Sequence, residues 1–269
     1  GHTAGENNLS GNNNVAMGSF SLGQSVTAND NVSIGYGSQG TNISASENVS
    51  VGGNALGGAS IAGLSGGQNT AVGNGALYVN ETGSGNVAMG LFALAANTTG
   101  TSNTSLGYGS ASSNITGSNI TTIGNGSDVG SSALNNATAI GANAIVNQSN
   151  SLILGNNANV GIGTTAPASI LNIVDDVNAQ TAILLENNTA GTGASAEFQI
   201  KNDASEYSKL GIRSSSTTPY GALLPNTSYF YTGACAFTIM VDDPSGVIQF
   251  ATGGNAAGML FDQAGNLGI

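Results

Sequence analysis

Charged side chains are scarce in this chain, in which Asp, Glu, Lys and Arg together make up 6% of 269 residues. A soluble globular protein usually carries about 25%. The only basic residues are Lys201, Lys209 and Arg213, and the formal net charge is −11. Because affinity for nucleic acid comes from Lys and Arg side chains that displace phosphate counterions, this composition excludes a nucleic-acid partner.

Cysteine, histidine and long apolar runs are equally scarce. Cys235 is the only cysteine and cannot form an internal disulfide, and His2 is the only histidine, so no Cys/His cluster with zinc spacing exists. No stretch approaches the roughly 20 apolar residues that span a bilayer. We therefore expect no metal, no cofactor and no direct insertion into a membrane. The opening Gly1-His2, without an initiator methionine or a signal peptide, indicates an excised fragment.

Glycine is abundant, with 42 residues, and it marks a repeat. Nine glycines that each follow an apolar residue are spaced 17, 17, 21, 17, 17, 17, 17 and 14 positions apart: Gly18, Gly35, Gly52, Gly73, Gly90, Gly107, Gly124, Gly141 and Gly155. Before each glycine, larger and small residues alternate with period two, as in Val15-Ala16-Met17, which predicts a short strand. The residue three positions after each glycine is again small, so the backbone must pass close to another segment there.

A 17-residue unit with one strand and glycine turns is typical of one coil of a parallel β-roll. Nine coils stacked about 4.8 Å apart would form a rod on the order of 40 Å long. We expect the Val, Ile and Met residues of the strands to be buried along the rod. The small residues on the other strand face would then allow identical rods to pack about a shared axis, which predicts a homotrimer.

The repeats also resemble a known family. The runs Asn14–Gly18, Asn31–Ser38 and Ala139–Ala144 are similar to the head repeats of trimeric autotransporter adhesins of the YadA type, over about residues 10–158. The resemblance implies left-handed parallel β-rolls in a tight trimer that projects from a cell surface. The period of 17 is longer than is common in that family.

A second segment of different composition follows, which divides the chain into a β-roll domain, 1–163, and a tip domain, 164–269. The phrase at Asn159–Ile173 returns in shortened form at Asn266–Ile269. It resembles the module boundaries of phage tail fibres and related bacterial fibre proteins, which implies that an S74-type intramolecular chaperone followed residue 269.

Short strand-like runs separated by turn clusters predict a β-sandwich for the tip domain. These runs are Ser169–Val174, Thr181–Glu186, Ser195–Lys201, Tyr207–Arg213, Ser228–Thr232, Ala236–Val241, Gly246–Ala251 and Met259–Asp262. The predicted fold class is therefore all-β, with a β-roll shaft followed by a sandwich.

Sequence patterns that could carry catalysis are weak. Gly35–Gly40 fits a dinucleotide-binding pattern but lies inside the repeat, with no βαβ unit after it. Gly63–Gly67 fits a nucleophile elbow, but no histidine is available to complete a triad. The acid pairs Asp175/Asp176 and Asp242/Asp243 could bind calcium or act as a glycosidase pair. Adjacent strand residues point to opposite faces, however, so we predict no catalytic residue and no metal site.

Aromatic residues give the strongest ligand-binding signal. Tyr220, Tyr229 and Tyr231, with Arg213 nearby in the sequence, could hold a sugar, because sugar rings lie on exposed aromatic faces. Core packing is the competing interpretation of these tyrosines. We therefore expect a non-enzymatic, homotrimeric fibre adhesin, located extracellularly on a cell surface or a virion, whose tip recognises a cell-surface glycan or envelope component. A structural spacer without ligand and a polysaccharide-depolymerising tailspike are the alternatives.

Overall fold

The computed structural model describes residues 2–58, 64–175, 183–187, 195–201, 207–213, 228–232, 248–251, 257–261 and 267–268. These residues form strands, turns and loops, and none of them lies in a helix. The described part of the chain accordingly offers no helix able to cross a bilayer. The chain divides into two compact units, Gly1–Asp176 and Val177–Ile269, which are described separately.

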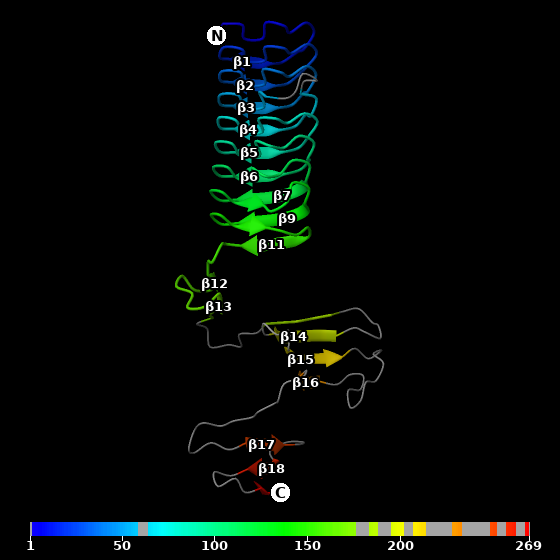
Figure 1. The fold of residues 1–269 in the computed structure, drawn as a ribbon, viewed down its shortest axis with the longest axis vertical. Coiled ribbons are helices and arrows are strands. Elements are labelled where there is room, and N and C mark those ends of the chain that lie inside the picture. Colours follow the sequence, from blue (N-terminus) through cyan, green and yellow to red (C-terminus); the bar gives the residue numbers. More distant parts are fainter. Residues whose placement is uncertain are drawn as a thin grey trace. The chain divides into compact units, whose positions relative to one another are not determined.

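The first unit is a parallel β-solenoid of about eight turns (Figure 1). One strand of each coil enters a single nine-stranded sheet, in which the strands follow sequence order. These strands are β1 (Val15–Met17), β2 (Val32–Ile34), β3 (Val49–Val51), β4 (Thr70–Val72), β5 (Val87–Met89), β6 (Thr104–Leu106), β7 (Ser118–Ile123), β9 (Asn135–Ile140) and β11 (Ser151–Leu154). The prediction of an all-β chain with parallel β-roll repeats is confirmed.

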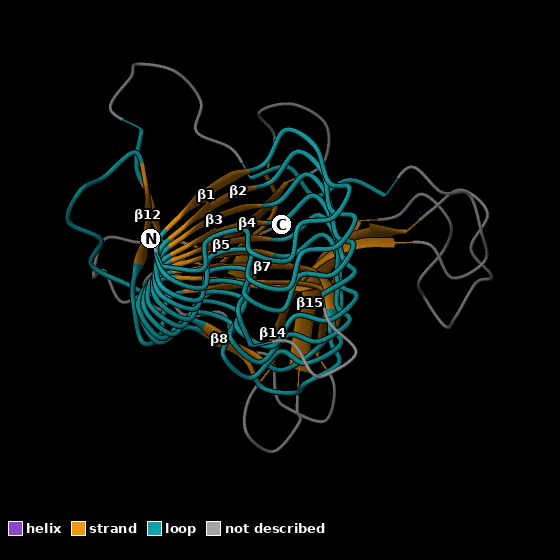
Figure 2. Cartoon of the chain, turned by 90° about the horizontal axis from the view of Figure 1, so that it is seen from above, coloured by secondary structure: helices purple, strands orange, loops and turns teal. Residues whose placement is uncertain are grey.

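Equivalent residues of successive coils pair directly, as Ala88 does with Ser105. Seen along the stack, the coils follow one another's outline (Figure 2). In the last coils a second parallel pair forms, between β8 (Asp128–Val129) and β10 (Ile145–Val146). β12 (Val160–Ile162) and β13 (Leu171–Ile173) form a further parallel pair after the solenoid. Each repeat of the sequence thus contributes one hydrogen-bonded strand to the sheet.

The strands turn their small residues into the coil and their large residues outward, so the predicted burial of the Val, Ile and Met residues was wrong. The middle residues of β2 to β6, such as Ser50 and Ala88, are buried, whereas Met89 and Leu106 are 43% and 44% exposed. The strands face this way because the coil interior is narrow. The small residue three positions after each glycine packs there against the middle residue of a strand. The hydroxyl oxygens of Ser38 and Ser50, for example, lie 2.6 Å apart.

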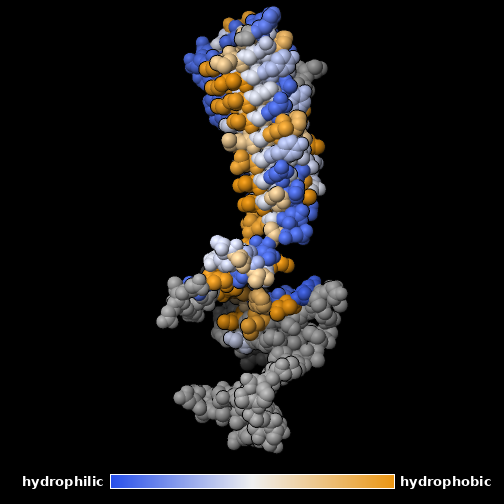
Figure 3. Space-filling view, turned by 90° about the vertical axis from the view of Figure 1, so that its left-hand side faces the viewer, coloured by the Kyte–Doolittle hydropathy of each residue, from blue (hydrophilic) through white to orange (hydrophobic). Residues whose placement is uncertain are grey.

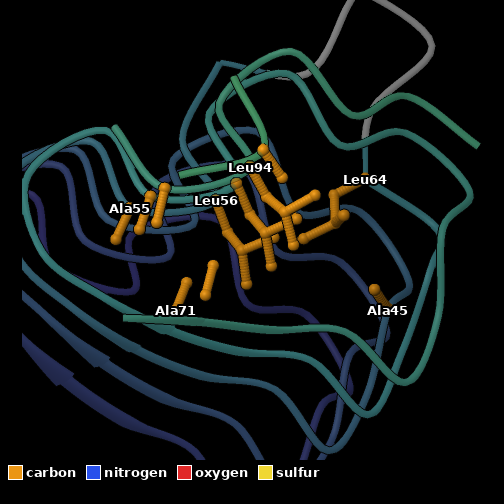
Figure 4. Packing of buried hydrophobic residues seen from close by; sticks show 11 residues of the cluster. Ala45, Ala55, Leu56, Leu64, Ala71 and Leu94 are labelled. Carbon is orange, nitrogen blue, oxygen red and sulfur yellow. The ribbon is translucent and has the colours of Figure 1, made fainter. Parts of the chain in front are cut away.

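A column of buried leucines fills the rest of the interior. Leu22, Leu56, Leu77 and Leu94 occupy the same position in their coils, immediately after the small residue, and are at most 1% exposed. Each has a positive φ between 49° and 52°, a left-handed conformation that is uncommon for leucine. Figure 4 shows Leu56 and Leu94 directed into the coil interior, where Ala71 of the strand also lies. Burying each such side chain stabilises the coil by about 1.5–3 kcal/mol.

A column of buried asparagines connects the coils immediately before the strands. The Asn86 backbone N–H donates to Asn69 Oδ1 at 2.9 Å, and the Asn103 N–H donates in turn to Asn86 Oδ1 at 3.0 Å. Asn86 Nδ2 donates to the Gly100 carbonyl at 2.9 Å. The same pattern links Asn14, Asn31, Asn48 and Asn69. The asparagine side chains therefore satisfy backbone N–H and carbonyl groups that have no backbone partner at the turn.

Replacing Asn86 by alanine is expected to lower the free energy of unfolding by about 1–3 kcal/mol, because the buried Asn103 N–H would lose its acceptor and the Gly100 carbonyl would keep only Asn97 Nδ2 as a donor. The matched substitution Asn125→Ala removes an exposed asparagine and should cost less than about 0.5 kcal/mol. Urea unfolding at one fixed protein concentration measures both. Equal transition midpoints for the two variants would contradict the role of the asparagine column.

The second unit contains two three-stranded antiparallel sheets among its described residues. One comprises β14 (Ser195–Lys201), β15 (Tyr207–Arg213) and β16 (Ser228–Thr232), with the bounds that the sequence predicts. The other comprises β17 (Ile248–Ala251), β18 (Ala257–Phe261) and β19 (Leu267–Gly268). The run predicted over Thr181–Glu186 is not a strand where it is described, at residues 183–186, and the run at Ala236–Val241 lies outside the described residues.

Candidate functional site

The predicted ligand residues fall on the β14–β15–β16 sheet. Tyr229 pairs with Gly211 and Tyr231 with Lys209, while Arg213 stands two positions beyond Gly211 in β15. Because alternate strand residues share a face, the register places Tyr229, Tyr231 and Arg213 on one face of the sheet. Tyr220, the fourth predicted residue, lies outside the described residues.

The opposite face of the same sheet is apolar. Phe198, Ile200, Leu210 and Ile212 occupy its register positions, and all four side chains are more than half exposed in the single chain. An uncovered apolar face of this kind requires a partner surface. By register, the sheet therefore has one face of apolar positions and one face that holds the positions of Tyr229, Tyr231, Lys209 and Arg213.

A second, longer apolar surface runs along the solenoid, and we call it the strand ladder. Its members are the residues that precede the nine spacing glycines, and all are at least partly exposed: Met17, Ile34, Val51, Val72, Met89, Leu106, Ile123, Ile140 and Leu154. Figure 3 shows hydrophobic residues aligned in a column along the stack of coils. Soluble monomers rarely expose a continuous apolar strip of this size, so the strand ladder is a candidate interface.

The repeat pattern identified these residues as one set, but the prediction placed their side chains in the interior. Period-two alternation shows which residues share a strand face, but not which face points inward. The sequence did hold a signal for the inward face, which is the small size of the residue three positions after each glycine. Where two small residues face each other, as Ser38 and Ser50 do, the backbone segments lie too close for the large strand residues to point inward.

The nucleotide-binding and nucleophile-elbow patterns are ordinary parts of the coils. Within Gly35–Gly40, the side chains of Ser38 and Gln39 are buried and hydrogen-bonded to the neighbouring coil, so these two polar side chains are not available to a phosphate. Within Gly63–Gly67, Leu64 is buried and its N–H donates to the Thr41 carbonyl at 3.0 Å. Gly63 itself lies outside the described residues.

Groups of three or more His, Cys, Asp or Glu side chains that could hold a metal ion do not occur among the described residues. Of the two acid pairs considered from the sequence, only Asp175 is described; Asp176, Asp242 and Asp243 lie outside the described residues.

Comparison with models of known protein families finds no match to the chain, and comparison with curated proteins finds no similar sequence. The strand ladder and the β14–β15–β16 sheet are therefore the two candidate functional surfaces of the described residues.

Proposed function

We propose that the chain is part of a homotrimeric, extracellular fibre adhesin, with a left-handed β-roll shaft and a β-sandwich tip. The observation that supports it best is the strand ladder, an apolar strip that continues over nine coils and is exposed in the single chain. Packing three shafts about a common axis would remove this strip from water on every coil at once. The resemblance to YadA-type head repeats supports three copies in particular.

The tip is the proposed recognition element. Tyr229, Tyr231 and Arg213 share one sheet face, and together with Tyr220 they would provide aromatic surfaces and hydrogen-bond donors for a glycan or an envelope component. The resemblance of Asn159–Ile173 to tail-fibre module boundaries supports a fibre on a cell surface or a virion. Low charge and a neutral polar composition suit such an exterior setting.

Binding to a glycan array and to intact bacterial and mammalian cells tests this proposal. The chain should bind at least one of these surfaces, and a monomeric variant should bind with about 10²-fold lower apparent affinity, because three linked copies act together. The double variant Tyr229→Ala, Tyr231→Ala should lose binding through the tip while it keeps its oligomeric state. An intact trimer that binds nothing would indicate a structural spacer, and release of reducing sugar ends from polysaccharide would indicate a depolymerase.

A further inference from the structure

A groove of about 420 Å³ lies across the turns of the first coils, and we call it the coil groove. Phe20 and Tyr36 stand at its edge, and Gly23, Gly40 and Gly57 contribute to its lining. None of its lining residues belongs to a strand. The coil groove is thus separate from the strand ladder that we propose to be buried in the trimer.

One column of the repeat that lines the groove has glycine in three successive coils. Gly23, Gly40 and Gly57 occupy equivalent positions, and the next coil has Tyr78 there. The Tyr78 ring lies against Gly58 of the preceding coil, where an added Cβ would overlap the ring carbons. With rungs about 4.8 Å apart, the three glycines line a trough that runs for about 10 Å along the stack, roughly the length of a disaccharide.

The aromatic side chains of the groove are accessible. The rings of Phe20 and Tyr36 are 5.7 Å apart in an edge-to-face arrangement, with an interplanar angle of 82°. Phe20 is 49% exposed and Tyr36 is 61% exposed, so neither is a core residue. A fixed pair of exposed rings beside a trough provides a stacking surface for the apolar face of a sugar ring.

Polar groups suited to sugar hydroxyls line the same groove. Glu6, Gln24 and Asn54 provide a carboxylate and two amides. Thr41 also belongs to the lining, but its hydroxyl oxygen is buried and has no hydrogen-bond partner among the described residues. The first unit, residues 1–176, contains no lysine and no arginine that would neutralise an anionic sugar. These groups favour a neutral saccharide.

An apolar extension adjoins the groove. A second hollow of about 360 Å³ is lined by Leu9, Val26 and Ile43, and it shares Asn7 and Gln24 with the coil groove. Together the two hollows combine a few polar groups with apolar walls, which is the usual composition of a small-molecule site.

We propose that the coil groove binds a short neutral saccharide, with one sugar ring stacked on Tyr36 and Phe20 and its hydroxyls hydrogen-bonded to Glu6, Gln24 and Asn54. This inference rests on the proposed adhesive function for its class of ligand. It adds a second recognition site, on the shaft, to the one proposed at the tip. Three such grooves per trimer would let the shaft contact a glycan layer along its side.

The substitution Tyr36→Ala tests the groove, and the chain offers a matched control. Tyr36 and Tyr108 lie in the same local sequence, Gly-Tyr-Gly-Ser, and are 61% and 56% exposed. Of these two tyrosines, only Tyr36 lines the coil groove. Binding is measured on immobilised lactose, mannobiose and chitobiose, with sialyllactose as the anionic comparison. We expect Tyr36→Ala to weaken binding to a neutral sugar by about tenfold or more, and Tyr108→Ala to bind as the unsubstituted chain does.

A blocking variant provides a second test that retains the tyrosine. Gly23→Tyr introduces at this position the residue that the fourth coil carries at Tyr78, and the atom nearest to the Cβ of residue 23 would be the Phe20 carbonyl oxygen, at 3.2 Å. The side chain should fill the trough and reduce binding as strongly as Tyr36→Ala does, with the molar mass unchanged.

The possible outcomes separate this inference from the proposed function. Neutral-sugar binding that survives both Tyr36→Ala and Gly23→Tyr but is lost in the tip double variant would overturn the groove and leave the adhesive function standing. Failure of the chain to bind any neutral sugar would also overturn the groove, while binding to sialyllactose or to cells would still support an adhesin. Absence of binding to every surface would contradict both.

Discussion

Replacing Gly124 by alanine is expected to destabilise the solenoid by at least about 4 kcal/mol. Gly124 has φ of +135°, a conformation that is essentially restricted to glycine. An added Cβ would also lie 2.6 Å from both the carbonyl carbon and the oxygen of Gly141 in the next coil. Both atoms belong to the backbone, so the contact is relieved only if the two coils separate.

The neighbouring coil provides the control for this variant. Gly109 has φ of +57° and no atom within 4 Å of an added Cβ. Gly109→Ala should therefore cost only about 1–2 kcal/mol, the strain of a left-handed alanine. Urea unfolding measures the difference, and hydrogen exchange should locate the loss of protection in the coils around Gly124 and Gly141, since each coil contacts only its neighbours. Similar midpoints for the two variants would refute the close stacking of the glycines.

Replacing Leu106 by glutamate is expected to convert the proposed trimer into folded monomers. Leu106 lies near the middle of the strand ladder and is 44% exposed in the single chain, so a monomer accommodates the glutamate in water. In the trimer, three carboxylates would be buried in an apolar interface without partners. At about 3–5 kcal/mol for each unpaired buried charge, the penalty is on the order of 10 kcal/mol per trimer.

Two further variants control for charge and for the ladder position itself. Thr99→Glu adds the same charge at an exposed residue outside the strands and should leave the molar mass unchanged. Leu106→Met places at this position the residue that the ladder carries at Met17 and Met89, and it should also preserve the trimer. Light scattering after size-exclusion chromatography gives the mass of each variant. A Leu106→Glu variant with the mass of the unsubstituted trimer would show that the ladder is not the interface.

The order and positions of the shaft strands could be predicted from the repeat period. Spacing glycines such as Gly90 and Gly107 marked the strand ends, because their backbone conformation and close stacking exclude other residues. The direction of the strand faces was not predictable from alternation alone, as the exposed Leu106 shows. Nor was the leucine column, since a left-handed conformation is not expected of a residue such as Leu77.

The two candidate sites differ in what the sequence could reveal. Strand bounds at β14 to β16 were predictable from local patterns, but the placement of Tyr229 and Arg213 on one sheet face depends on strand register, which local patterns do not specify. The coil groove was missed, although a signal was present. Glycine at position 23 and its equivalents, followed by Tyr78 in the fourth coil, breaks the repeat in one column, and only the three-dimensional stacking shows that this break forms a trough.

The molar mass of the unsubstituted chain in dilute solution is the most direct test of the central claim, that coils with small residues inside and an apolar ladder outside associate in threes. We expect three times the 26.2 kDa of one chain, unchanged over a wide range of micromolar concentrations. A stable, soluble species of 26.2 kDa, with the strand ladder open to water, would contradict it.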